Sequence, residues 1–362
     1  MNKVVNILSE GPISYNGRAF LQPIILNKDQ LLEYSIEVNL IYELKNDISD
    51  CDLLIVDSKF FRGWWQTRKQ DLLDKLAKLN QDTNVVFFDT SDSAGYLLGE
   101  VLPFVNAYYK HQTLVDKSYY LKPMYGRRLF TDYYHNHNNI SDIHSFEEKD
   151  IQVIQNSDLD KIRVFWNTGL ANYSFLGDYL GKIYRKFPIK GILRYPKNFT
   201  KPSSNRPLDV QCRFGVSYNK ETVAFQRKSI AKILKDRLQT EKVNRYKFYR
   251  ELKQSKVVIS PFGLGEITLK DFEVFLTGSL LMKPYMDHMN TWPNFYTEET
   301  FIPFKWNLKN ISTKLENILD NYQDFIEIAE NGQEIYRYHI ATSEGNIEFL
   351  ERFRDIVFYE AK

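Results

Sequence analysis

Residues 255–296, SKVVISPFGLGEITLKDFEVFLTGSLLMKPYMDHMNTWPNFY, contain the pattern on which the interpretation of the whole chain depends. The apolar run KVVIS predicts a buried strand, and it leads into a turn in which Gly263 and Gly265 let the backbone approach a ligand closely. A helix is predicted over 271–277, and a second apolar strand over 279–282. Strand, turn, helix and strand in this order predict one βαβ unit of a parallel sheet.

The start of this helix is a candidate phosphate site. A helix N-terminus at the carboxyl edge of a parallel sheet directs unsatisfied backbone N–H groups, and the positive end of the helix dipole, into the cleft. Lys270 lies at the expected helix start and adds a cation. Gly-rich turns before helices also occur in proteins that bind no nucleotide, so the turn alone does not identify the site.

The bulk properties predict a soluble globular protein with two domains. A chain of 362 residues is too long for one ordinary core, and its 43% hydrophobic and 26% charged residues are typical of globular proteins. A net charge of +2 gives no basic excess of the kind that nucleic-acid partners require. The aromatic content of 15% fits a large core or ring-stacking on sugars.

Cysteine use and the N-terminus point to the cytoplasm. Cys51 and Cys212 are far apart and form no CxxC pattern, which indicates free thiols in a reducing compartment. The start MNKVVNILSEGP is too short and too polar for a signal peptide, and no apolar run is long enough to span a membrane. Peripheral contact with a membrane stays open, as does the oligomeric state.

Alternating strands and helices are predicted in both halves of the chain. In the first half we expect strands at 4–8, 36–42, 53–56 and 85–88 and a helix at 66–79. Residues 96–144 are less regular and suggest loops or a strand pair, and the polar stretch 145–160 reads as a linker. The pattern then restarts, with a strand at 162–166, another near 191–193, and helices at 173–187, 221–238, 246–252, 311–329 and 346–358.

The stretch quoted above resembles the donor-binding region of GT-B glycosyltransferases, of the glycosyltransferase group 1 and exostosin-like kind. The residues that carry the resemblance are Ser260-Pro261-Phe262-Gly263, Gly265-Glu266, Asp271-Phe272-Glu273, Gly278, Lys283-Pro284, His288 and Trp292-Pro293-Asn294. The clear likeness covers about 40 residues, and a weaker one extends over most of the C-terminal half.

The resemblance implies an α/β protein of the GT-B fold, with two Rossmann-like domains that face a central cleft. Residues 1–150 would bind the acceptor, 151–340 would bind a nucleotide-sugar donor, and 341–362 would form a helix that packs back on the first domain. The implied activity is transfer of a sugar from the donor to a hydroxyl acceptor, such as a glycan or polysaccharide precursor. The nucleotide sugar is then a co-substrate, and no separate cofactor is implied.

The resemblance also assigns roles to individual donor-site residues. Glu273 would accept hydrogen bonds from the ribose hydroxyls, and Glu266 would face the donor sugar or phosphate as a catalytic residue. The two glutamates are 7 residues apart, a spacing that differs from the retaining branch, so the stereochemical outcome is not predicted. The remaining donor-site candidates from the motif are Gly263, Gly265, Lys283 and His288, the last of which could equally be an ordinary loop histidine.

Basic residues are expected to neutralise the departing diphosphate. Arg213 and Arg227 lie upstream of the motif, and Lys270 lies within it. Either arginine could instead belong to a solvated surface. Because the sequence holds no Cys/His cluster and no Asp-x-Asp pair after a strand, we expect catalysis without a metal ion.

The acceptor side is expected at the ends of the first-half strands. Asp92 follows the strand at 85–88 and is the candidate general base, with Asp89 next. Asp and Ser are also preferred helix N-caps, which is the alternative interpretation of this segment. Gly17 and Arg127 are further acceptor-site candidates.

Two other classes of function remain open from the sequence. One is a GT-B-fold nucleotide-sugar epimerase, and the other is a non-catalytic carbohydrate-binding protein. A Rossmann dehydrogenase is disfavoured because no GxGxxG follows a predicted strand.

Overall fold

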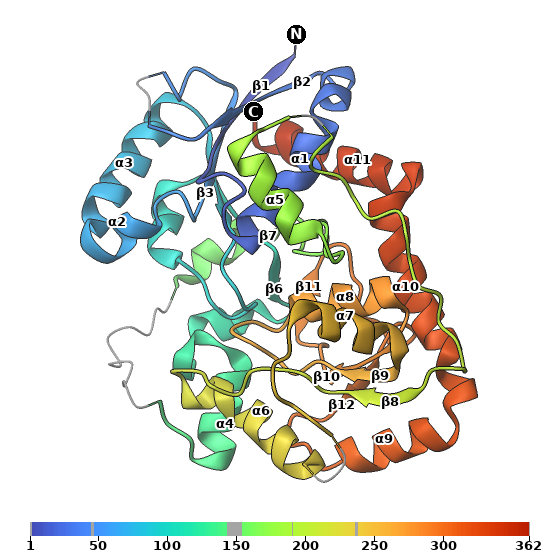
Figure 1. The fold of residues 1–362 in the computed structure, drawn as a ribbon. Helices are drawn as coiled ribbons and strands as arrows, with labels where there is room; N and C mark the ends of the chain where they lie inside the picture. The colour runs from blue at the N-terminus through green and yellow to red at the C-terminus, as the bar shows by residue number, and fades with distance from the viewer. Residues whose placement is uncertain (1, 45–46, 143–153, 190, 236–237, 362) are drawn as a thin grey trace.

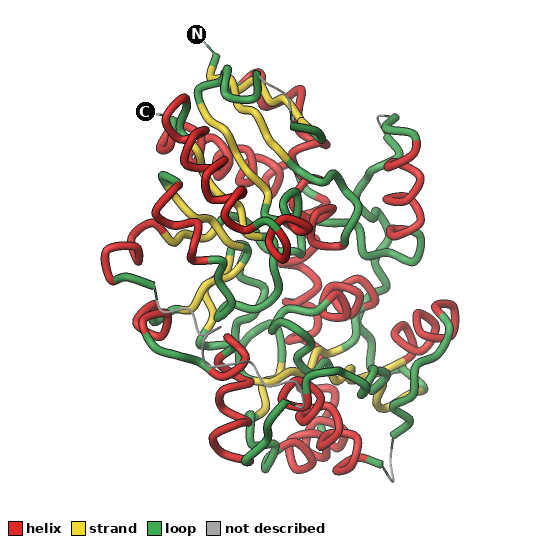
Figure 2. Tube along the Cα trace, turned by 90° about the vertical axis from the view of Figure 1, so that its left-hand side faces the viewer, coloured by secondary structure: helices red, strands yellow, loops and turns green. Residues whose placement is uncertain are grey.

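The computed structural model describes residues 2–44, 47–142, 154–189, 191–235 and 238–361. These residues form two α/β units, each built on a parallel sheet, which lie one above the other in Figure 1. Figure 2 shows the strands at the centre of each unit with the helices around them. The predicted fold class, two Rossmann-like units that face a cleft, is therefore confirmed by the architecture.

The first sheet has the strand order β2-β1-β3-β4-β5-β7, and each adjacent pair is parallel. Both faces of β3 and β4 are buried, which explains why these strands are continuous apolar runs in the sequence. The strands are β1 (Lys3–Leu8), β2 (Ile36–Ile41), β3 (Leu53–Asp57), β4 (Val85–Asp89), β5 (Ala107–Lys110) and β7 (Ile162–Val164).

The second sheet has the order β12-β10-β9-β8 and is also parallel. The stretch 255–296 supplies its two central strands and the helix between them, as the sequence predicts. The elements are β8 (Leu208–Gln211), β9 (Ser255–Ile259), α8 (Leu269–Thr277), β10 (Leu280–Pro284) and β12 (Ile302–Phe304). Gly278 ends α8 with φ +66°, a left-handed conformation that favours glycine.

Helices flank both sheets. In the first half they are α1 (Tyr15–Glu33), α2 (Arg62–Thr67), α3 (Lys69–Asp82) and α4 (Leu129–Asn138). In the second half they are α5 (Gly177–Lys186), α6 (Glu221–Leu234), α7 (Arg245–Gln254), α9 (Ile311–Asp320), α10 (Ile326–Ala341) and α11 (Ser343–Glu360).

Two features join the units. Strand β6 (Gln112–Leu114), which follows the first sheet's β5, pairs antiparallel with β11 (Met289–Thr291) from the second half. Helix α11 returns to the first unit, where the rings of Phe349 and Phe353 pack against Trp166 at centroid distances of 5.2 and 6.0 Å. The chain therefore crosses between the units more than once.

Several expected boundaries differ from the structure. Strand β7 belongs to the first sheet, so that sheet extends past the boundary predicted at 150. The predicted linker 145–160 falls partly outside the described residues, and a short 3-10 helix, Asn156–Lys161, overlaps its end. Residues 191–193 form no strand, and the helix expected over 311–329 is interrupted near residue 321.

Candidate functional site

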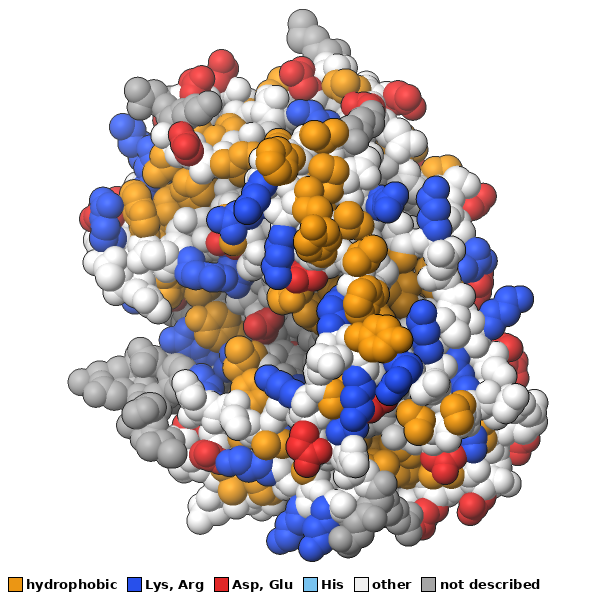
Figure 3. Space-filling model, viewed as in Figure 1, with side chains coloured by type: hydrophobic (Ala, Val, Ile, Leu, Met, Phe, Trp, Pro, Cys, Tyr) orange, Lys and Arg blue, Asp and Glu red, His pale blue; other side chains and the backbone are white. Residues whose placement is uncertain are grey.

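A cavity of about 520 Å³ lies between the two units, at the carboxyl ends of both sheets. Figure 3 shows the molecule hollowed between its upper and lower halves. This is the place where open parallel sheets generally bind ligands. The lining side chains and turns come from both units, namely Ser14, Tyr15, Asn16, Lys59, Arg62, Ser91, Asp92, His111, Gln112, Thr168, Tyr218, Arg227, Gly263, Leu264, Gly265, Ile267, Thr268 and Leu269.

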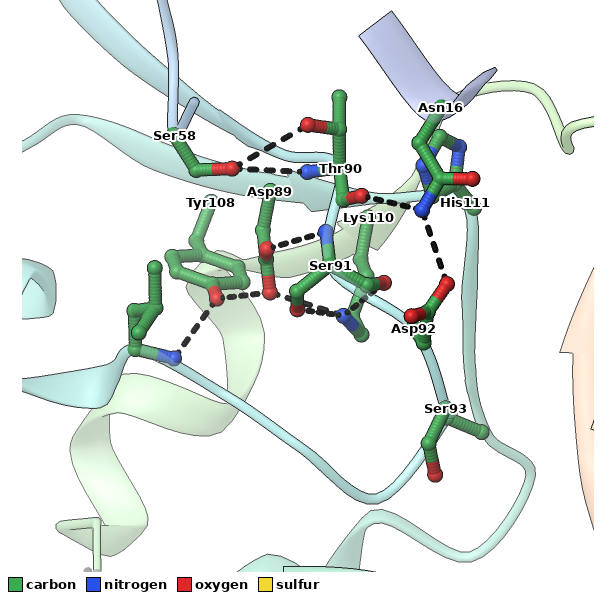
Figure 4. A network of polar contacts seen from close by, with 12 residues as sticks. Asn16, Ser58, Asp89, Thr90, Ser91, Asp92, Ser93, Tyr108, Lys110 and His111 are labelled. Atoms are coloured by element: carbon green, nitrogen blue, oxygen red, sulfur yellow. Dashed lines mark hydrogen bonds and ion pairs between the residues drawn. The ribbon is translucent and has the colours of Figure 1, made fainter. Parts of the chain in front are cut away.

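Asp92 is exposed in this cavity, on the wall formed by the first unit. The Nδ2 atom of Asn16 donates to the Asp92 carboxylate and to the Thr90 carbonyl, both at 2.9 Å (Figure 4). Asn16 is held in turn by the first turn of α1, whose N-cap Ser14 accepts from the Gly17 amide at 3.0 Å. The predicted candidate base therefore faces the cleft with one amide donor orienting it.

Asp89 lies behind this wall and cannot reach a ligand in the cavity. Its carboxylate is fully buried, 2.8 Å from the Lys110 ammonium and 2.6 Å from the Tyr108 hydroxyl (Figure 4). Burial alone would raise the pKa of Asp89, but the Lys110 charge and the hydrogen bonds hold it below its usual value. The acceptor role predicted for Asp89 is replaced by a structural one.

His111 is a cavity residue that sequence reasoning missed. Its ring is buried, Nδ1 lies 3.2 Å from the Trp166 carbonyl, and Nε2 makes no hydrogen bond with the described residues. Burial, and then the neighbouring Lys110 ammonium, lower the pKa of His111 to about 4. His111 is therefore a neutral imidazole at the edge of the cavity, with its Nε2 atom buried and without a hydrogen-bond partner among the described residues.

The turn after β9 forms the opposite wall. Gly263 and Gly265 both line the cavity, and the Gly263 amide donates to the Gly265 carbonyl at 2.9 Å. A Cβ atom on Gly265 would lie 2.6 Å from the Ser93 amide nitrogen. Glycine at 265 is therefore required by the close approach of the two units.

Glu266 does not face the cavity. Its buried carboxylate accepts from the Ser93 hydroxyl and from the Ala94 amide, each at 3.0 Å, and lies 3.6 Å from Nε2 of His288. Burial opposes ionisation, but the contacts with His288 and the Ala94 amide lower the pKa of Glu266 below its usual value. Glu266 therefore binds the second unit to the first, and the His288 ring packs beside Glu266, Phe262 and Trp306. Neither residue lines the cavity, contrary to the prediction that both bind the donor.

Lys283 is likewise a structural residue. It is fully buried, and its Nζ atom lies 3.1 Å from the carboxylate of Asp271. Asp271 in turn closes a capping box with Thr268 at the start of α8. Lys283 supports the helix start from behind and does not line the cavity, contrary to the prediction that it binds the donor.

Two cations, the buried Arg227 and the half-buried Lys270, do face open space. Both line a second cavity of about 260 Å³ beside the first, and Arg227 lines the first as well. Arg227 donates to the carbonyls of Phe262 and Gly215, and Lys270 donates to that of Arg213. Within the described residues no carboxylate lies within 4 Å of either cation, and burial lowers the pKa of Lys270 to about 8.

The remaining donor-site candidates are Arg213 and Glu273. Arg213 lines the second cavity but is already paired, because Glu251 accepts two hydrogen bonds from it at 2.9 Å. Glu273 lies one turn after Lys270 on α8, with Tyr249 at 3.0 Å and a side chain 12% exposed. Burial raises the pKa of Glu273 to about 7.

Two acceptor-site candidates lie outside the cavity. Gly17 is buried in the first turn of α1, and Arg127 lines a separate small pocket against Tyr96. By contrast, Lys59 and Arg62 line the cleft from the segment directly after β3. The strand-end rule that selected Asp92 would also have selected them.

The described part of the chain was searched for metal-binding groups and for membrane-spanning helices. No group of three or more His, Cys, Asp or Glu side chains there is arranged to hold a metal ion. None of the helices that the structure describes has the length and apolarity needed to cross a membrane.

Comparison with solved structures finds similar chains among glycosyltransferases. An alpha-glucosyltransferase in complex with UDP and a 13-mer DNA is 13% identical, with a TM-score of 0.41 over 99% of this chain and 100% of that one. Anabaena HepE with UDP-glucose is 10% identical, with a TM-score of 0.43 over 98% and 100%. A glycosyltransferase from Rickettsia africae is 10% identical, with a TM-score of 0.44 over 100% and 99%.

No family model matches the sequence, and no curated protein matches it. None of the three structures is described as exostosin-like, and that narrower part of the resemblance stays a prediction.

Replacing Lys283 by Met should destabilise the protein without acting at the cavity itself. The change leaves the Asp271 carboxylate buried without its cation, which typically costs about 3–5 kcal/mol. Urea unfolding should show this loss, whereas the control Lys228→Met, at an exposed position on α6, should change stability by less than about 0.5 kcal/mol. An unchanged unfolding midpoint for Lys283→Met would contradict the structural role.

Proposed function

We propose that this protein is a glycosyltransferase that moves a sugar from a nucleotide-sugar donor to a hydroxyl acceptor. The observation that carries the proposal is a pair of cations, the buried Arg227 and the half-buried Lys270. Both lack a carboxylate partner among the described residues and line cavities beside the start of α8. Buried positive charge without a counter-ion is costly, so a bound anion would stabilise this wall. A nucleotide diphosphate is such an anion.

The start of α8 supports the same placement of the diphosphate. Thr268 and Leu269 line the first cavity, and the N-terminus of α8 presents the positive end of its dipole there. Gly263 leaves room for a phosphate, since a Cβ atom at this position would meet nothing closer than 3.5 Å. As the bond between the sugar and the diphosphate breaks, Arg227 and Lys270 would take up the negative charge.

The nucleoside would occupy the smaller cavity. Its walls include the rings of Phe214 and Phe248, against which a base could pack. Glu273 lies beside Lys270 and is our candidate for accepting hydrogen bonds from the ribose hydroxyls. In this arrangement the second unit holds the donor.

The first unit would hold the acceptor. The Asp92 carboxylate would accept the proton of the acceptor hydroxyl as its oxygen attacks the anomeric carbon. His111, Lys59 and Arg62 would contact the acceptor or the transferred sugar from the same wall. With a net charge of +2, the chain gives no reason to prefer a nucleic-acid acceptor over a glycan or polysaccharide precursor.

A thermal-shift screen against nucleotides and nucleotide sugars tests the donor site. A ligand that binds only the folded state raises the Tm, and Lys270→Met should weaken that donor by about 10- to 100-fold through loss of a charge-assisted hydrogen bond. Each shift is measured from the variant's own ligand-free Tm. Lys228→Met, whose side chain pairs with Glu221 on the surface, is the matched control and should bind normally. Failure of every nucleotide to shift the Tm would overturn the donor site.

Asp92→Asn should lower kcat by about 10²- to 10⁴-fold with little change in the donor KM, because the base acts in the chemical step and does not contact the nucleotide. The assay follows acceptor glycosylation and nucleotide release together, so that donor epimerisation or simple binding is distinguished from transfer.

We propose that transfer needs no metal ion, so activity should persist when the same assay is run in EDTA. Activity that returns only with magnesium or manganese would contradict that proposal.

Donor affinity should be greatest between about pH 7 and 8. Glu273, with a pKa of about 7, must lose its proton to accept both ribose hydrogen bonds, so affinity rises through this pH. Lys270, with a pKa of about 8, must keep its proton to bind phosphate, so affinity falls above it. Calorimetric titration of donor at several pH values measures both the rise and the fall of affinity. In Glu273→Gln the rise of donor affinity through pH 7 should disappear. If that rise persists, Glu273 is excluded as the titrating group.

A further inference from the structure

A cluster of large apolar side chains is exposed on and around α5. Phe175, Leu176, Tyr179, Phe187 and Ile189, which we call the α5 surface, are 43–63% exposed. Single exposed apolar residues are ordinary, but five of them within one short segment form a patch typical of an interaction surface. In Figure 3 hydrophobic side chains run down the face on which α5 lies in Figure 1.

The charge around the α5 surface is positive. Lys182, Arg185 and Lys186 are all exposed on α5. The carboxylate of the same helix, Asp178, is already bound by Arg18 at 3.1 Å and by Lys182 at 2.8 Å. Lysine and arginine side chains flank the hydrophobic band in Figure 3. The patch therefore combines apolar rings with a local excess of cations.

The α5 surface adjoins the cleft. Arg18, which holds Asp178, lies over the ring of Tyr15 at 5.0 Å, and Tyr15 both lines the cavity and is 46% exposed. Ile13, just before it in the chain, is 49% exposed. The apolar patch thus extends to the rim of the site without contributing its chemistry.

We infer that the α5 surface docks the protein on the face of an anionic lipid bilayer. Aromatic and aliphatic side chains that enter the headgroup region, with Lys and Arg beside them, are the combination by which short helices lie on membranes. Each such cation adds attraction to anionic lipids, and the attraction decays within a Debye length. Pairing with a second copy of the chain is disfavoured, since a symmetric contact through this surface would bring two copies of the same positive patch together.

Vesicle co-sedimentation of the full chain tests this inference. Phosphatidylcholine vesicles with and without about one-third phosphatidylglycerol are compared at low and high salt. The wild type should sediment with the anionic vesicles at low salt, and much less with neutral vesicles or in high salt. Tyr179→Ser/Phe187→Ser and Arg185→Glu/Lys186→Glu should each reduce the bound fraction at least tenfold.

A matched control comes from α6, on the other unit. Lys232 and Ile233 are both exposed there, so Lys232→Glu/Ile233→Ser reverses one charge and removes one apolar side chain away from the α5 surface. This variant should bind vesicles as the wild type does, and all variants should keep the wild-type Tm. The inference is overturned if the folded wild type ignores anionic vesicles, or if the control loses binding as strongly as the α5 variants. It is also overturned if Tyr179→Ser/Phe187→Ser dissolves a dimer in sedimentation equilibrium and leaves vesicle binding intact.

Discussion

The geometry of the second unit depends on one buried carboxylate, that of Asp271. It accepts hydrogen bonds from Ser260 at the end of β9, from the backbone and side chain of Thr268, and from Tyr296, and it pairs with Lys283 on β10. Two strands, a helix start and a later loop therefore converge on a single group. Because a buried charge is tolerated only when all its partners are in place, the start of α8 is fixed before any ligand arrives.

The two walls of the cleft differ in the groups that hold their charged side chains. On the first wall, the buried Asp89 is neutralised by Lys110, and the exposed Asp92 has an amide donor at 2.9 Å. On the second wall, Arg227 and Lys270 are held by backbone carbonyls. The first wall also carries Lys59 and Arg62, so cations line the cavity from both units, and Arg227 is the buried cation of the second wall.

The sequence predicted the strands of the fold more accurately than the residues of the site. Continuous apolar runs and glycine turns placed β3, β4, β9 and β10 almost to the residue, because strands buried on both faces leave a strong signal. The aromatic and polar stretch around β5 and α4 left no such periodicity. The sequence therefore predicted only loops or a strand pair there, and neither the bounds of β5 nor the cavity residue His111 was identified. The motif does not reveal which of its residues point inward. Glu266 and Lys283 turned out to be buried supports, because their partners, Ser93 and Asp271, are set by tertiary packing.

The contact between Gly265-Glu266 and the segment 92–94 joins positions about 173 residues apart in the chain. A side chain added at 265 would collide with the Ser93 backbone, and a loop altered at 93 or 94 would leave the Glu266 carboxylate without its donors. Neither segment can change freely while the other stays as it is. In the descent of this protein, the two segments should therefore have been inherited as a matched pair, and exchanging one unit for that of a distant homologue would require that both sides of this contact be exchanged together.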